Sequence, residues 1–147
     1  MSQKTTRAYG FEQVHVGEEL PELRKTVTVD QIRAYADASG DHNPIHLDEV
    51  FARSVGLPGV IAHGMLTMAF AAQLVTDWVG DRRRLTGLRG RFGAMVVPGD
   101  ELRCAGIVTG KDKERRRLTI EVSVENQKGE KVFSKGVADV DFMAEEN

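Results

Sequence analysis

The strongest pattern in the sequence is a long segment, residues 63–79, in which apolar side chains occupy nearly every helical position. No charged side chain lies between Gly64 and Thr76. A helix that is apolar on all sides needs protein around it. Thr67 and Gln73 interrupt the apolar run, which is also too short to cross a bilayer. The pattern therefore predicts one long buried helix, with a sheet wrapped around it.

The residues after this helix carry the pattern of β-strands. Apolar and polar side chains alternate in residues 118–125, which predicts a strand with one buried and one wet face. Three further strands are predicted downstream of the helix, at residues 85–97, 102–109 and 132–142. Glycine-containing turn signals separate them. On the last strand Ser134, Gly136 and Ala138 are expected to share one face, where their small size would let a helix lie close.

The first part of the chain predicts a short edge strand at residues 23–28 and a helix that follows it directly. Thr28 is suited to cap the start of that helix, and Gly40 is suited to end it. The order of strand, helix, loop, long helix and antiparallel strands indicates the α+β class. We expect a flexible leader (residues 1–10), a single domain (residues 11–142) and an acidic tail (residues 143–147).

Composition narrows the class of function. Of the 147 residues 29% are charged, and the formal net charge is −2. These values are typical of a soluble globular protein and argue against a dedicated nucleic-acid-binding protein. The single cysteine, Cys104, excludes an internal disulfide and is expected to be a buried thiol. Residues 1–10 lack the hydrophobic segment of a signal peptide, so a cytoplasmic protein with no membrane association is expected.

Candidate chemistry is concentrated in the loop that follows the first helix, Ser39-Gly40-Asp41-His42-Asn43-Pro44-Ile45-His46. This loop holds the carboxylate of Asp41, the amide of Asn43 and the imidazole of His46 within one rigid turn. General acid–base catalysis needs such a pair of proton-transferring groups. Glycine, Asx residues and proline also build ordinary turns. The structural alternative is therefore that Asp41 and Asn43 only bond the local backbone.

The start of the long helix, Ala62-His63-Gly64-Met65, is the second candidate. The N–H groups of a first helical turn are unpaired and carry partial positive charge. Aimed at a thioester carbonyl, they would stabilise an enolate, although Gly64 could also serve only tight packing. His63 is interpreted as a structural, hydrogen-bonded side chain. A metal site built from Asp41, His46 and His63 is a weaker alternative, because no metal-ligand spacing supports it, so neither metal nor cofactor is predicted.

Two arginine triplets, residues 82–84 and 115–117, are the remaining chemical feature. Solvated turns are their ordinary role. The alternative is recognition of phosphate groups on a carrier, because the planar guanidinium suits phosphate geometry.

Several motifs together resemble the signature of the R-specific enoyl-CoA hydratases, the MaoC-like dehydratase family. The first comprises Tyr35, Ser39, Gly40, Asp41, Asn43, Pro44, Ile45, His46 and Ala52. Ile61-Ala62-His63-Gly64-Met65 is similar to the start of the family's central helix, and Arg91-Phe92 with Val97-Pro98-Gly99-Asp100 is similar to the strand and turn that follow. The resemblance covers residues 11–142. Within the family, the chain looks most like the catalytic subunit of actinobacterial (3R)-hydroxyacyl-carrier-protein dehydratases.

The resemblance implies a hot-dog fold and a homodimer or heterodimer with a continuous sheet across its interface. The implied activity is reversible hydration of trans-2-enoyl thioesters to (3R)-3-hydroxyacyl thioesters of CoA or acyl carrier protein. Asp41 and His46 would form the catalytic dyad, Asn43 would orient it, and the N–H of Gly64 would bind the oxyanion. The implied substrate-binding residues are Ala62, His63, Met65 and Phe92.

Two other functions are consistent with such a fold. A hot-dog thioesterase could use the same oxyanion site but would direct water at the carbonyl carbon. A non-catalytic acyl-binding subunit of a dehydratase heterodimer would be expected to lack part of the dyad, and this chain lacks none. The residues leave the carrier and the acyl length open, and the acyl length is expected to depend on residues 52–61.

Overall fold

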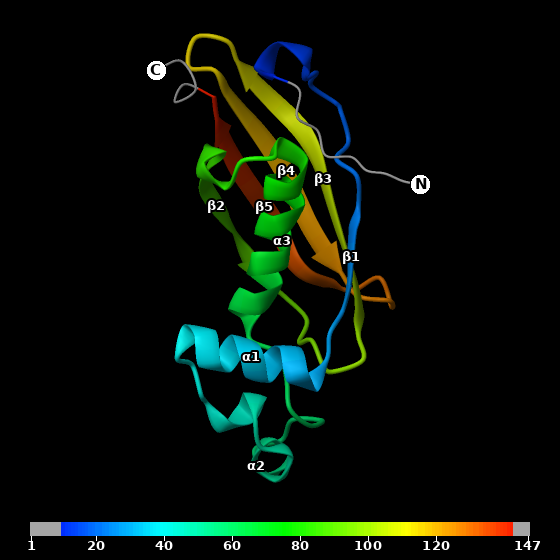
Figure 1. Cartoon of the computed structure of the whole chain (residues 1–147). Coiled ribbons are helices and arrows are strands. Elements are labelled where there is room, and N and C mark those ends of the chain that lie inside the picture. The colour runs from blue at the N-terminus through cyan, green and yellow to red at the C-terminus, as the bar shows by residue number, and fades with distance from the viewer. Residues whose placement is uncertain (1–9, 143–147) are drawn as a thin grey trace, which may run out of the picture.

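The computed structural model describes residues 10–142, which form a five-stranded antiparallel sheet with a long helix against one face (Figure 1). The helices are α1 (Val29–Ser39), α2 (Glu49–Ser54) and α3 (Gly64–Val79), with short 3-10 turns η1 (Phe11–Gln13), η2 (Pro44–His46) and η3 (Arg82–Arg84). The strands are β1 (Leu23–Thr26), β2 (Leu85–Phe92), β3 (Glu101–Asp112), β4 (Arg117–Glu125) and β5 (Lys131–Asp141). The predicted leader, except for Gly10, and the predicted tail lie outside the described residues.

The sheet has the strand order β1-β3-β4-β5-β2, and every neighbouring pair is antiparallel. Helix α3 packs along the sheet, and α1 lies across the end at which α3 begins (Figure 1). This arrangement confirms the predicted α+β hot-dog fold. The loop between α1 and α3 is thereby held beside the N-terminus of the central helix.

The local signals of the sequence are reproduced closely in α1 and β4. The hydroxyl of Thr28 accepts a hydrogen bond from the N–H of Gln31 at 3.0 Å, as an N-cap does. Gly40 ends α1 in the left-handed conformation, with φ of 79°. In β4 buried apolar side chains alternate with polar side chains that are partly or fully exposed, as the period of two predicts.

Strand β2 is shorter than predicted. It ends at Phe92, whereas the apolar pattern extends to residue 97. Phe92 pairs with Phe133, and the partner strand β5 begins at Lys131. Few residues of β5 are therefore left to pair with the chain after Phe92. The chain then crosses to the start of α3, where the carbonyl of Val96 accepts a hydrogen bond from the N–H of Ala62 at 2.8 Å.

A bulge in β5 changes which side chains face the helix. Val122 pairs with Gly136, but Val124 pairs with Phe133, so two residues of β5 are accommodated opposite one residue of β4. Lys135 takes a positive φ of 52° at this point. The prediction that Ser134 shares a face with Gly136 is therefore wrong, because Phe133 is the buried side chain there.

Helix α3 is enclosed by the sheet on one side only. Leu66, Phe70 and Leu74 are buried in the core, but Met65 is 54% exposed and Ala69 is also exposed. We expected α3 to be enclosed on all sides, but within this single chain one side is open. The residues on that side, such as Met65 and Ala69, are also apolar. Among the described residues no helix is long and apolar enough to cross a membrane. The cytoplasmic location stays a prediction.

Candidate active site

The loop after α1 is shaped by local hydrogen bonds. A carboxylate oxygen of Asp41 accepts from the N–H of Asn43 at 3.2 Å, and the side-chain oxygen of Asn43 accepts from the N–H of Ile45 at 3.2 Å. Such bonds are expected if Asp41 and Asn43 only hold the local backbone in a turn. Each uses one oxygen, so the second carboxylate oxygen of the exposed Asp41 has no hydrogen bond within residues 10–142. The turn therefore orients Asp41 without using up its carboxylate.

His46 is 8% exposed, and a backbone carbonyl fixes its ring. Its Nδ1 lies 2.7 Å from the carbonyl oxygen of Ile61. Because a carbonyl can only accept, Nδ1 carries the hydrogen and donates it. In the neutral ring the lone pair is then on Nε2, as a general base requires.

His63 lies against both members of the proposed dyad. Its Nε2 donates to the backbone carbonyl of Asp41 at 3.0 Å, and its ring stacks on His46 with centroids 3.7 Å apart and planes at 21°. Tyr35 contacts the same ring edge-on, at 4.9 Å between centroids. His63 is thus the hydrogen-bonded structural side chain expected from the sequence.

Asp41, His46 and His63 each offer one metal-ligating atom, and these atoms all lie within 4.8 Å of one another. The structure therefore brings together the residues of both hypotheses, the acid–base pair and the weaker metal site. The two imidazole rings are nearly parallel. Because the nitrogen lone pairs lie in the ring planes, stacked rings do not direct them at a common ion. The ring geometry favours the acid–base pair.

Gly64 is the first residue of α3, and its N–H has no hydrogen-bond acceptor among the residues that the structure describes. A Cβ added at Gly64 would lie 3.2 to 3.3 Å from three carbons of the Phe92 ring. Phe92 is 53% exposed, and Met65, the residue after Gly64, is 54% exposed. Two exposed apolar side chains therefore neighbour Gly64. Ala62, in contrast, is buried and is bonded to Val96 through its N–H.

A groove runs along the open side of α3 from this point. Its first part has a volume of about 430 Å³ and is lined by Tyr35, Met65, Met68, Ala69, Ala72 and residues 85–88. Past Ala72 and Leu85 it continues into a wider hollow of about 890 Å³, which reaches Asp77 and Arg82. An open groove, mostly apolar in its first part, therefore begins at Met65 and at Tyr35, whose ring contacts His63. By contrast, α2, within the segment expected to set acyl length, does not line it.

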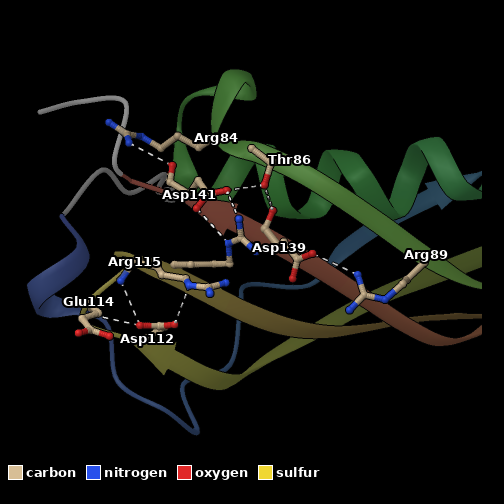
Figure 2. A network of polar contacts seen from close by, with 9 residues as sticks. Arg84, Thr86, Arg89, Asp112, Glu114, Arg115, Asp139 and Asp141 are labelled. Carbon is tan, nitrogen blue, oxygen red and sulfur yellow. Dashed lines mark hydrogen bonds and ion pairs between the residues drawn. The ribbon is translucent and has the colours of Figure 1, made fainter. Parts of the chain in front are cut away.

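The arginine triplets are mostly engaged within the chain. Arg83 makes two hydrogen bonds to the carboxylate of Asp81, and Arg116 bonds Glu12. Figure 2 shows Arg84 and Thr86 reaching toward Asp141 at the end of β5. These contacts favour the structural role over phosphate recognition for the arginines that make them.

Arg117 also binds Asp141, through two nitrogens at 3.0 and 3.1 Å. Its guanidinium holds the pKa of the Asp141 carboxyl below the usual range, and it thereby joins β4 to β5. The buried thiol predicted at Cys104 is confirmed, and burial raises its pKa to about 12.

The part of the site that the sequence did not reveal is the backbone and ring geometry around Ile61. This residue contributes a carbonyl, which any residue type could supply. The stacking of His63 on His46 joins segments that are 17 positions apart, and no spacing rule signals it.

Fold and site together define the class: a hot-dog domain with a carboxylate and an imidazole at the start of its central helix. The family model of the MaoC like domain matches residues 11–131. The chain therefore belongs to the MaoC-like dehydratase family.

The chain is similar to curated relatives over about half of its length. It is 45% identical over 71 residues to fatty acid synthase subunit beta of Aspergillus oryzae, covering 46% of this chain and 4% of that protein. It is 41% identical over 66 residues to peroxisomal enoyl-CoA hydratase 2 of Arabidopsis thaliana, covering 44% of this chain and 21% of that protein. Each relative is thus much longer than the matched segment.

Among solved structures, the unliganded R-hydratase PhaJ1 from Pseudomonas aeruginosa matches with a TM-score of 0.83 and 27% identity, over 92% of this chain and 86% of that one. Both chains therefore share the fold over nearly their whole length. The finer likeness to an actinobacterial dehydratase subunit stays a prediction.

Proposed function

We propose that this protein catalyses the reversible addition of water to trans-2-enoyl thioesters, giving (3R)-3-hydroxyacyl thioesters. One observation carries the proposal. The carboxylate of Asp41 and the imidazole of His46 lie together, within 4.8 Å, beside the N-terminus of α3. Similarity to a peroxisomal enoyl-CoA hydratase and to an R-hydratase supports it.

In the hydration direction a water molecule lies between Asp41 and His46. As the water oxygen bonds to C3 of the enoyl group, the dyad takes one of its protons and delivers a proton to C2. The bond from His46 to the Ile61 carbonyl leaves Nε2 as the nitrogen that exchanges protons. Asn43 shapes the turn that holds Asp41, because its N–H bonds the carboxylate.

Negative charge develops on the thioester oxygen while C2 gains or loses its proton. The N–H of Gly64 is the donor for that oxygen, supported by the partial positive charge of the α3 N-terminus. Losing one donor of this kind typically costs about 2.7–4 kcal/mol in the transition state. The acyl chain lies in the groove that begins at Tyr35 and Met65.

A second hot-dog chain, identical or related, covers the open side of the molecule in this proposal. Strand β2 is at an edge of the sheet, where a further strand can pair with its backbone. The apolar open side of α3 lies next to that edge, and both would be buried together. Light scattering tests this: a homodimer has twice the mass of the 16.2 kDa chain, whereas a heterodimer forms only after a partner is added.

The decisive assay follows the loss of enoyl absorbance from a short trans-2-enoyl-CoA, with chiral analysis of the product. We expect Asp41→Asn to lower kcat by about 100-fold or more. Asp37→Asn is the matched control, because Asp37 is an exposed carboxylate on α1 whose side chain bonds only His42 within residues 10–142. A folded Asp41→Asn variant with the full rate would refute the assignment.

A DTNB assay for free thiol, run on the same substrate, and mixing with a second chain separate the alternatives. Release of free thiol with the enoyl group intact would indicate a thioesterase. Activity that appears only after a second hot-dog chain is added would indicate that the partner completes the substrate site. A chain-length series on CoA and acyl-carrier-protein thioesters then identifies the carrier, and it tests the likeness to the actinobacterial dehydratase subunit.

A further inference from the structure

His63 is the buried polar side chain of the site that the proposed reaction does not use. It is 3% exposed, yet it contacts both halves of the dyad. Its Nδ1 has no hydrogen-bond partner in the described part of the chain. The hydrogen bond of this ring thus goes to Asp41, and its two aromatic contacts go to His46 and Tyr35.

Asp41 depends on this contact for its position. Within residues 10–142 its other hydrogen bonds are local, one from the N–H of Asn43 to its carboxylate and one from its own N–H to the hydroxyl of Ser39. Local bonds fix the shape of a turn but not its place relative to the helix. The bond from His63 Nε2 to the Asp41 carbonyl, across 22 residues of sequence, ties the turn to the start of α3.

His46 is held from the same segment. The carbonyl of Ile61 binds its Nδ1–H, and the ring of His63, two residues further on, stacks on its face. The Ile61 N–H in turn donates to the carbonyl of Ile45 at 3.1 Å. Residues 61–64 therefore contact the carboxylate loop and the imidazole, and the same short stretch includes Gly64, the proposed oxyanion donor.

We propose that His63 is a positioning residue, whose Nε2–H holds the Asp41 carbonyl and thereby sets the distance between the Asp41 carboxylate and His46. The inference rests on the proposed function, since the dyad is the group that it positions. Misplacement of catalytic groups by about 1 Å can cost about 100-fold in rate. In metal sites, loss of a contact that orients a ligating side chain typically costs about 10- to 100-fold.

Two substitutions distinguish the effect of the hydrogen bond from His63 Nε2 from the effect of ring stacking on His46. His63→Phe keeps an aromatic ring to stack on His46 but has no donor. His63→Gln loses the ring but carries an amide N–H that can occupy the place of Nε2. His42→Gln is the matched control, because His42 lies in the same loop, is exposed and, in the described part of the chain, pairs only with Asp37.

Steady-state kinetics give the first readout. We expect His63→Phe to lower kcat by about 10- to 100-fold with little change in KM, because the dyad is displaced while the acyl groove is intact. His63→Gln should recover most of the lost kcat, and His42→Gln should match the wild type. A normal kcat in His63→Phe overturns the proposal, and so does a His63→Gln variant that is as slow as His63→Phe.

Long-range ¹H–¹⁵N correlation of the imidazole rings gives a readout that needs neither turnover nor a folded variant. At mildly alkaline pH the wild-type protein should show His63 protonated on Nε2 and His46 on Nδ1, the opposite tautomers. A hydrogen on Nδ1 of His63 overturns the proposal. Failure of the proposed function is recognised separately, because the wild-type protein itself would then convert no enoyl thioester.

Discussion

Replacing Gly64 with proline tests the oxyanion site without changing any side chain that transfers protons. Gly64 is the first residue of α3, where a backbone N–H has no helical acceptor. Proline is favoured at this position because the missing N–H costs no helical hydrogen bond. The preceding residue, His63, already has φ of −64° and ψ of 137°, which lies in the extended region that a following proline requires. The helix should therefore tolerate the substitution.

The steric cost of adding a Cβ at residue 64 is small, and an alanine variant measures it. The added Cβ would approach the Phe92 ring to 3.2 Å, a few tenths of an ångström closer than an ordinary contact. Phe92 is 53% exposed, so its ring has room to move. Gly64→Ala carries the same added Cβ but keeps the N–H. The difference between the two variants thus reports the replacement of the N–H hydrogen by the ring carbons of proline.

We expect Gly64→Pro to have kcat/KM about 100- to 1,000-fold below that of Gly64→Ala, the equivalent of about 2.7–4 kcal/mol of lost oxyanion stabilisation. The assay is the loss of enoyl absorbance at low substrate concentration, with thermal melts of both variants in parallel. The free energy of unfolding should differ between them by no more than about 1 kcal/mol. Equal kcat/KM in the two folded variants would show that the N–H of Gly64 is not the donor.

Three other predictions concern the framework of the fold. Because burial raises the pKa of Cys104 to about 12, a thiol reagent should label the native protein very slowly and the guanidinium-unfolded protein at once, and rapid native labelling would contradict this. Arg117 lowers the pKa of Asp141 below its ordinary 3.8, so this carboxylate stabilises the fold fully above pH 3.8, and the contribution is lost as the pH falls through the lowered value. Asp141→Asn should cost about 1 kcal/mol near pH 7, and chemical unfolding at several pH values should show the difference from wild type closing in acid. Gly136→Ala would place a Cβ 2.5 Å from the Val122 carbonyl oxygen, so it should destabilise the protein by about 1–3 kcal/mol, and an unchanged melting temperature would refute the close approach.

Features encoded by neighbouring residues could be predicted from the sequence. The cap at Thr28, the left-handed Gly40 and the alternation in β4 depend on interactions within a few positions. The loop from Asp41 to His46 could be identified for the same reason, because its residues form one turn. The open apolar side of α3 was also present in the pattern, but the pattern alone could not tell which side of the helix the sheet covers.

Register and long-range contacts were decided only by the tertiary structure. The bulge in β5 places Phe133 inside instead of Ser134, since pairing with β4 and β2 fixes the register and a single strand pattern cannot record an added residue. The early end of β2 depends on where β5 begins.

The site shows the same division between local and long-range information. The sequence by itself determined the fold class and the candidate groups Asp41, Asn43, His46 and Gly64, because each belongs to a local motif. The tertiary structure decided that a backbone carbonyl fixes the tautomer of His46 and that His63 joins it to the carboxylate loop. Carbonyl groups are common to all residues, and ring stacking depends on how separate segments are packed, so neither leaves a trace in the spacing of residues along the chain.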